Sequence, residues 1–272
     1  MLWILAALCF CALNSHPTAA LRLQDHQQIS HHKYYLGRHR SLHGYAFVHY
    51  HHKDGPNRTT TGPGPGWKAH HLNKRQLGSP CTAPISDGAR WRVSEGYYVH
   101  TRNNQGLSEP YVLSTMARAM DAWRCVLGGT LGLSVIGPRI GVRRNTPAST
   151  FPIDRPTGEN EIGFGPIEGR PGTVAVTVVW GVFGGPVAAR EIREFKMRFD
   201  EEHYRFGNAS LSGVFMDLEA IATHECGHAH GLDDIYLAPC GHVTMFGTSR
   251  NGETKKRTLA AEDASGILGL YQ

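Results

Sequence analysis

The stretch THECGHAHGLDD, residues 223–234, concentrates groups that can bind a metal ion or carry a proton. Residues four apart lie on the same face of an α-helix, one turn apart. His224 and His228 can therefore direct imidazole nitrogens at one metal ion. Glu225 lies beside the first of these histidines, where it can reach a water molecule on the metal. The spacing predicts a metal-binding helix with a neighbouring general base.

A third ligand is expected just beyond this helix. Gly231 can end the helix in the left-handed conformation, which lets the chain turn and Asp234 reach back. Three protein ligands leave a fourth position for water, as in catalytic zinc sites. Asp233 is the alternative ligand, although the spacing favours Asp234. His230 turns away from the ligand face and is expected to pack or lie at the surface, and nothing in the spacing of His242 requires it at the metal.

The first 20 residues are typical of a cleaved secretory signal. They are almost wholly apolar from Leu2 to Leu13 and end in small residues at Ala19 and Ala20. The apolar run is too short to span a bilayer, and no later run is longer and as apolar. We therefore expect a secreted protein with no membrane contact in its mature form. The 272 residues are enough for one sizeable core.

Residues 21–75 differ in composition from the rest. They hold ten of the 17 histidines and few aliphatic residues, which is too little to build a large core. Residues 1–75 carry nine Lys and Arg against two acidic residues, whereas the remainder carries 19 against 21. The basic charge thus belongs to the N-terminal part and gives no support for nucleic-acid binding by residues 76–272.

The pair Lys74-Arg75 lies where composition and charge change, and it predicts a cleavage site for a dibasic processing protease. We interpret 21–75 as a His-rich propeptide and 76–272 as the catalytic domain. A retained flexible arm is the alternative. The histidines of a propeptide could respond to pH or occupy the metal before removal, or the segment could simply aid folding and solubility.

Four cysteines remain after the signal, which predicts two disulfides of undetermined pairing in an oxidising compartment; they are Cys81, Cys125, Cys226 and Cys240. Cys226 lies in the motif on the side away from the metal, so a disulfide or core position is expected for it. Two glycosylation sequons begin at Asn57 and Asn208.

Three helices are expected. One runs from Pro110 to the Gly128-Gly129 pair, with an apolar face formed by Met116, Met120, Trp123 and Leu127. The second is the metal-binding helix, from about Asp217 to His230. The third starts at about Leu259, with an apolar face formed by Ala264, Ile267, Leu268 and Tyr271.

Strands are expected between and before these helices, at residues 91–99, 131–136, 160–164, 173–180 and 194–199. The unbroken β-branched run at 173–180 indicates a buried strand, and the alternation at 194–199 indicates a half-buried one. The order is mixed α and β around one sheet.

The segment HECGHAHGLDD resembles the H-E-x-x-H-x-x-G-x-x-H/D motif of the metzincin metalloproteases. VTMFG at 243–247 is similar to their Met-turn, and residues 258–272 resemble the C-terminal helix of matrixin-type domains. The resemblance implies zinc bound by His224, His228 and Asp234, with Glu225 as general base and Met245 supporting the site.

The resemblance also implies an α+β fold, with a twisted, mostly parallel sheet whose edge strand lies along the cleft; residues 160–164 are expected near that edge. The chain departs from the family pattern in three ways. Most matrixins have histidine at Asp234, whereas an aspartate there is similar to snapalysin-like enzymes. The segment 21–75 has no cysteine for a cysteine switch, and Phe246 replaces the tyrosine of astacin-type turns.

The expected function is a secreted zinc metalloendopeptidase that cleaves internal bonds of protein or peptide substrates, with one catalytic Zn²⁺ ion and as a monomer. No sequence pattern supports a calcium site. The alternatives are a secreted His-rich zinc-binding protein without catalysis and a catalytically inactive matrix-binding protein on a protease scaffold.

Overall fold

The computed structural model of the chain describes residues 21–30, 33–52, 79–131, 142–144, 151–168 and 171–272. The expected signal (1–20), the Lys74-Arg75 pair and the Asn57 sequon lie outside the described residues. Within these described ranges, no helix is long and apolar enough to cross a membrane.

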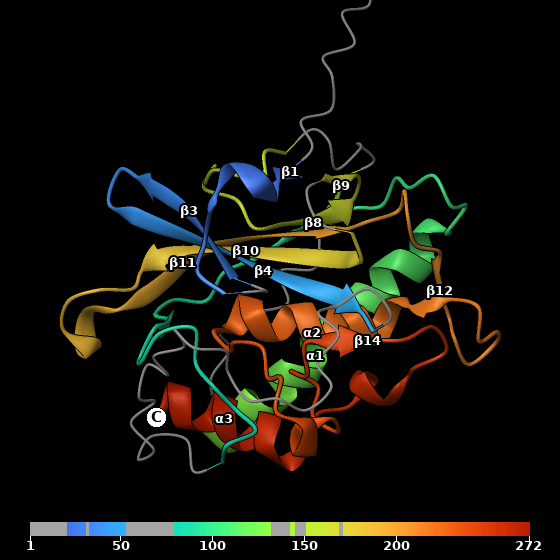
Figure 1. Ribbon diagram of the computed structural model, residues 1–272. Coiled ribbons are helices and arrows are strands. Elements are labelled where there is room, and N and C mark those ends of the chain that lie inside the picture. Colours follow the sequence, from blue (N-terminus) through green and yellow to red (C-terminus); the bar gives the residue numbers. More distant parts are fainter. Residues whose placement is uncertain (1–20, 31–32, 53–78, 132–141, 145–150, 169–170) are drawn as a thin grey trace, which may run out of the picture.

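A large sheet forms the upper layer of the molecule (Figure 1). Its strand order is β2-β3-β4-β10-β11-β8-β6-β7. The strands in that order are Gln27–Gln28, Lys33–His39, Leu42–His51, Thr173–Val182, Glu191–Phe199, Glu161–Phe164, Tyr98–His100 and Val142–Arg144. The pairs from β2 to β11 are antiparallel, and the pairs from β11 to β7 are parallel.

Short elements complete the sheets. β5 (Arg90–Trp91) adds to β11, and β14 (Thr248–Ser249) adds to β4 in parallel. Two small parallel pairs join β1 (Leu21–Arg22) to β9 (Ile167–Glu168) and β12 (Phe206–Gly207) to β13 (Met216–Asp217). Single 3₁₀ turns occur at Leu23–Asp25, Val187–Ala189, Ala238–Cys240 and Lys255–Arg257.

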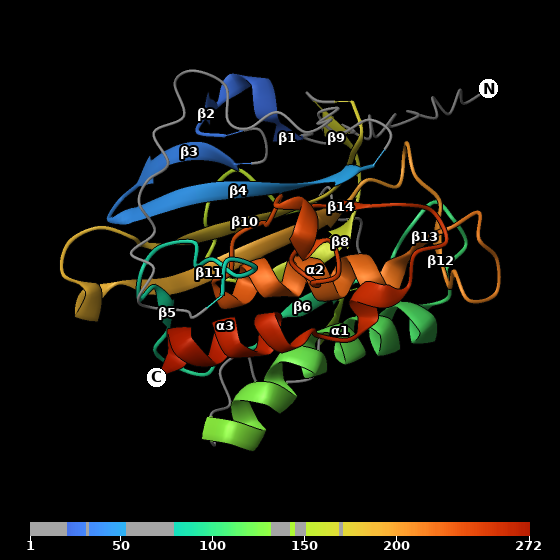
Figure 2. The ribbon, with the colours of Figure 1, turned by 60° about the horizontal axis from the view of Figure 1, so that its bottom comes forward.

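Helices α1 (Glu109–Leu131), α2 (Leu218–His230) and α3 (Ala261–Tyr271) lie beneath the sheet, with α2 next to it (Figures 1 and 2). The predicted apolar face of α1 is confirmed, because Met116, Met120, Trp123 and Leu127 are all buried in the core between helices and sheet. The indole N–H of Trp123 donates to the carbonyl of Thr223 at 2.8 Å, which fixes α1 against α2.

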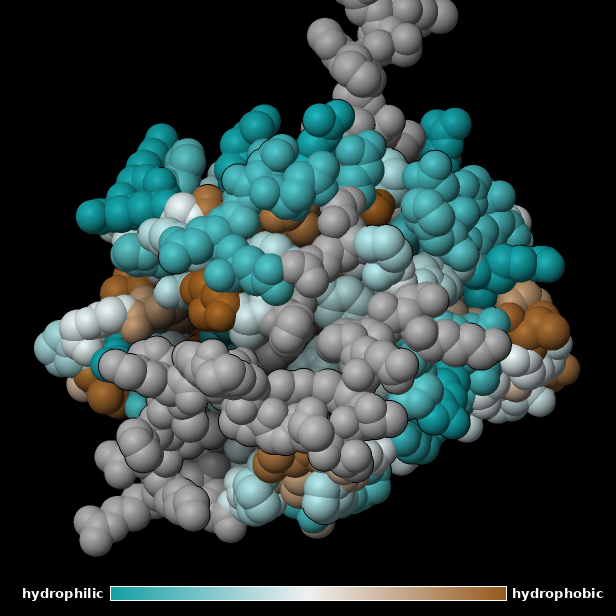
Figure 3. Space-filling model, viewed as in Figure 1, coloured by the Kyte–Doolittle hydropathy of each residue, from teal (hydrophilic) through white to brown (hydrophobic). Residues whose placement is uncertain are grey.

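A smaller apolar cluster covers the other face of the sheet. It combines inward residues of β4 and β10, such as Val48 and Trp180, with residues from the N-terminal segment and from the loop before β8, such as Leu23 and Phe151. The outer surface above it is mainly hydrophilic in the view of Figure 3, with hydrophobic residues in small separate patches. The strand 173–180 is buried from both sides, as predicted.

Three sequence-based expectations about the sheet are wrong. The sheet is mixed rather than mostly parallel, because the β3–β4 and β10–β11 hairpins supply antiparallel pairs. Residues 161–164 of the segment 160–164 form β8, which lies between β11 and β6 instead of near an edge along the site. The strand 194–199 is fully buried, since Lys196 on it is paired with Glu161 and Glu194 inside the protein.

Boundaries differ as well. The segment 91–99 is divided between β5 and β6, with bends between them. Helix α1 continues past Gly128-Gly129 to Leu131, so these glycines do not end it. The first residue of the strand expected at 131–136, Leu131, is the last residue of α1. Residues 132–136 lie outside the described residues.

Strands β2, β3 and β4 of the N-terminal segment are part of the large sheet, which the composition did not predict. Strand β4 makes an antiparallel pair with β10 along nearly its whole length. This arrangement agrees with the expectation that the segment has no large core of its own, because its apolar side chains pack on residues from the rest of the chain.

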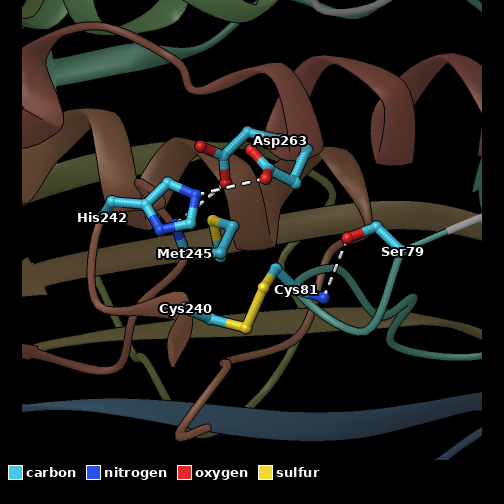
Figure 4. Close-up of a disulfide and its surroundings, with 7 residues drawn as sticks. Ser79, Cys81, Cys240, His242, Met245 and Asp263 are labelled. Atoms are coloured by element: carbon cyan, nitrogen blue, oxygen red, sulfur yellow. Dashed lines mark hydrogen bonds and ion pairs between the residues drawn. A yellow bond between two sulfur atoms is a disulfide. The ribbon is translucent and has the colours of Figure 1, made fainter. Parts of the chain in front are cut away.

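One disulfide joins Cys81 to Cys240, across 159 residues of sequence (Figure 4). The expectation of two disulfides is wrong, because Cys125 is free and exposed on α1 while Cys226 is free and buried on α2.

Candidate metal centre

Helix α2 starts and ends as its sequence predicts. Asp217 caps the first turn by accepting a hydrogen bond from the Ala220 N–H at 2.9 Å. Gly231 ends the helix with φ of 110°, and its N–H bonds to the carbonyls of Gly227 and His228. A Cβ on Gly231 would lie 3.0 Å from the backbone oxygen of Ala89, so both conformation and space require glycine.

The turn after Gly231 brings Asp234 back to the two helix histidines. Asp234 Oδ1 lies 3.1 Å from His224 Nε2 and 3.6 Å from His228 Nε2. One ligand atom from each of the three residues lies within 4.8 Å of the others, so the three form a group that can hold one metal ion. All three side chains are buried.

Hydrogen bonds fix the orientation of both imidazoles. His224 Nδ1 lies 2.8 Å from the carbonyl of Thr244, and His228 Nδ1 lies 2.8 Å from that of Leu232. A carbonyl accepts only a proton donor, so Nδ1 carries hydrogen in each ring and Nε2 is left to coordinate a metal.

The facing atoms have no ordinary partners. Within the described residues, His224 Nε2, His228 Nε2 and both carboxylate oxygens of Asp234 are buried without a properly aligned hydrogen bond. Burial raises the pKa of Asp234, but the histidines outweigh this effect and hold it well below its usual value. Buried polar atoms normally have partners. Two imidazole nitrogens and a carboxylate suit Zn²⁺, so the donor set fits a zinc ion.

Glu225 lies beside this group with one oxygen anchored. Its Oε2 accepts a hydrogen bond from the Thr177 hydroxyl of β10 at 2.5 Å, whereas its Oε1 is buried with no hydrogen-bond partner among the described residues. Burial raises the pKa of Glu225 to about 7, and the Thr177 hydroxyl acts in the opposite direction. A carboxyl group with this pKa can accept and release a proton near neutral pH. Sequence reasoning missed Thr177, which precedes Glu225 by 48 residues.

The competing ligand candidates lie elsewhere. Asp233 pairs with Lys33 at 3.0 Å instead of joining the group. His230 is buried and approaches the Cys226 carbonyl through Nδ1 at 2.7 Å, which places it in the core rather than at the surface. His242 pairs with Glu262 at 3.2 Å, and its side chain is about half exposed.

Met245 lies in the turn beneath α2, where its side chain is buried. Asp263 of α3 accepts hydrogen bonds from the backbone N–H groups of Thr244 and Met245 at 2.7 and 3.1 Å. Figure 4 shows Met245 and Asp263 close to the Cys81–Cys240 disulfide. The carbonyl of Thr244, which orients His224, thus belongs to a turn that α3 holds in place.

Strand β4 also contacts the candidate metal ligands. Phe47 stacks on the His228 ring with centroids 4.7 Å apart, and His49 lies against His224 with centroids 4.1 Å apart. His49 Nε2 is 2.9 Å from the hydroxyl of Ser249 on β14. Ligand atoms of His49, His224 and Glu225 lie within 4.8 Å of one another. The only local signal for these contacts is a weak one, the histidine-rich run after residue 42.

Comparison with protein-family models finds no match to this chain, and comparison with curated proteins finds no significant similarity.

Proposed function

We propose that this chain is a secreted zinc-dependent metalloendopeptidase, with His224, His228 and Asp234 as metal ligands and Glu225 as general base. The observation that carries the proposal is the convergence of buried, unsatisfied ligand atoms beside a buried carboxylate. The resemblance of residues 224–234 to the metzincin motif supports the same assignment.

The three proposed ligands contribute different groups to the metal site. Each histidine presents Nε2 to the metal, because its Nδ1 donates to a backbone carbonyl. Asp234 contributes the negative charge that partly neutralises a divalent cation. When bound in such a site, zinc polarises a substrate carbonyl and lowers the pKa of a coordinated water to about 7.

Glu225 performs the proton transfers in this proposal. Thr177 holds Oε2, which leaves Oε1 to accept a proton from the attacking water. The carboxyl group then delivers that proton to the leaving amine, since its pKa of about 7 makes it both an acceptable base and an effective acid. No covalent intermediate with the protein is required.

The test compares Glu225→Gln with Glu219→Gln, the same change made six residues earlier on α2. Glu219 forms an ion pair with Arg118 outside the group of ligands. Both variants are first cut between β4 and residue 79 and separated from the N-terminal piece. They are then assayed on casein and on a quenched fluorescent peptide. We expect Glu225→Gln to lose about 100- to 10,000-fold in kcat and to keep its bound zinc. We expect Glu219→Gln to match the wild type in both respects.

Chelation followed by zinc addition should abolish and restore the wild-type activity. Undiminished cleavage by Glu225→Gln would refute its assignment as the base. A wild-type protein that binds zinc in this form but cleaves neither substrate would favour the non-catalytic zinc-binding alternative.

A further inference from the structure

Strand β4 lies between strands β10 and β14 at the candidate metal centre. On one side it runs antiparallel to β10, where Phe47 is opposite Thr177. On the other side its C-terminal end runs parallel to β14, the strand that follows the Met245 turn. The N–H of His52 donates to the carbonyl of Ser249 at 2.9 Å. The segment is therefore bound by main-chain hydrogen bonds from both sides, as an extended peptide would be.

The side chains of β4 alternate between the two faces of the sheet, and those facing α2 reach the site. Phe47 covers the ring of His228, and His49 covers the ring of His224. A ring nitrogen of His49 also lies within 4.8 Å of a carboxylate oxygen of Glu225. Figure 2 shows β4 passing above α2 together with β10. The strand thus covers both helix ligands and the proposed base.

Contacts outside the site hold this strand in place. Lys33 of β3 forms an ion pair with Asp233, next to the third ligand, and donates to the carbonyl of Ile85 at 3.2 Å. On the opposite face, Gly44 lies beneath the Trp180 indole, and a Cβ at this position would lie 2.5 Å from the ring. The β3–β4 hairpin therefore makes specific polar and packing contacts with residues of the rest of the chain.

We infer that the β3–β4 hairpin, residues 33–51, occupies the groove in which the substrate binds, and that the uncut chain is latent for this reason. The inference rests on the proposed function. It assigns the substrate class as peptides in extended conformation that pair antiparallel with β10 and parallel with β14. Removal of the hairpin exposes the edge of β10, and strand addition to an exposed edge is a general mode of peptide recognition.

In this inference, His49 blocks the site next to Glu225, the proposed general base. Its ring nitrogen groups with His224 and Glu225, whereas the group of His224, His228 and Asp234 does not include it. The blocking group is therefore a histidine beside the general base, held by Ser249. Among the described residues of the N-terminal segment, no cysteine or carboxylate belongs to a group that could hold a metal ion.

The experiment compares the full chain before and after cleavage at a protease recognition sequence inserted after Gly62, with Lys74 and Arg75 replaced by Ala. The N-terminal piece is separated after cleavage. Hydrogen exchange at the β10 amides reports on hairpin docking independently of any metal, and hydrolysis of a fluorogenic peptide reports on the site.

We expect exchange of the β10 amides that face β4 to become at least tenfold faster after separation, and hydrolysis to rise at least 100-fold. A synthetic peptide of residues 42–51 should restore protection and inhibit. The same peptide with Phe47→Ala and His49→Ala should inhibit at least tenfold more weakly, while a Leu42→Ala peptide should retain inhibition within about twofold.

A second variant tests the inference in the uncut chain, in case the hairpin stays bound after cleavage. Gly44→Ala should displace β4 from Trp180 and raise hydrolysis by the uncut chain at least tenfold. Gly184→Ala, where a Cβ meets nothing within 4 Å, is the matched control and should leave it unchanged.

Equal hydrolysis by the uncut and separated forms, or β10 exchange that does not change on separation, would overturn the inference. If exchange and peptide rebinding behave as expected but no form hydrolyses peptides, the proposed catalytic function fails while the hairpin remains the occupant of the groove.

Discussion

Met245 packs against Gly227 so closely that a Cβ on Gly227 would overlap the Met245 sulfur. Gly227 lies on α2 between Glu225 and His228, so the glycine allows the Met245 turn to approach the helix from below. The Trp123 ring is 2.8 Å from the same Cβ position. The spacing of α2, α1 and the turn is thus set at the residue adjacent to the proposed metal ligand His228.

Gly227→Ala should destabilise the protein by about 1–3 kcal/mol, because overpacking a filled core forces neighbouring side chains to shift. It should also weaken zinc binding, since the shift occurs next to His228. Urea denaturation and zinc titration measure the two effects, with Gly184→Ala as the control. Unchanged stability and affinity would mean that Met245 does not constrain the helix.

Thr177→Val should move the acidic limb of the kcat/KM profile to higher pH. Burial raises the pKa of Glu225 to about 7, and the Thr177 hydroxyl stabilises the charged carboxylate. Loss of that hydroxyl leaves the pKa higher still, so a higher pH is needed to ionise the base. Thr177→Ser keeps the donor and should restore the wild-type profile; identical profiles for Val and Ser would argue against the bond.

Asp263→Ala should destabilise the protein by about 1–3 kcal/mol, because the N–H groups of Thr244 and Met245 lose their acceptor. Its distinct effect should be on metal affinity, because the turn that orients His224 loosens. Glu262→Ala, at the partly exposed neighbouring position that pairs with His242, is the control. If Asp263→Ala keeps full zinc affinity, the turn does not depend on α3.

Replacing Cys81 and Cys240 together by Ser should lower the free energy of unfolding by about 2–5 kcal/mol, since the bond closes a long loop. Cys125→Ser removes an exposed free thiol and should change stability little. Denaturant titrations of the two variants under non-reducing conditions make the comparison. A small loss for the double variant would show that other contacts already restrain the 79–81 segment.

The sequence predicts the local part of the site because that part depends on one helix and one turn. The spacing of His224 and His228, the glycine bend and the return of Asp234 all follow from helical geometry over eleven residues. The apolar face of α1 and the buried strand 173–180 follow from periodicity in the same way.

The remainder depends on contacts between distant residues, which local patterns do not encode. Thr177 meets Glu225 only after β10 is laid over α2. His49 and Phe47 reach the proposed ligands because β4 joins the sheet, whereas the composition predicted only that the segment has no large core of its own. The mostly parallel sheet was implied by the resemblance, but the antiparallel pairs of the N-terminal hairpin and of β10 with β11 make it mixed.

The most direct test of the metal centre is the zinc content of the purified chain after dialysis against a weak chelator, for the wild type, Asp234→Ala and Asp233→Ala. Adjacent aspartates make this a matched pair, because Asp234 lies in the ligand group and Asp233 pairs with Lys33. We predict one zinc per chain for the wild type and for Asp233→Ala, and loss of most of it for Asp234→Ala. Full zinc retention by Asp234→Ala, or a wild-type chain that holds none, would contradict the three-ligand centre.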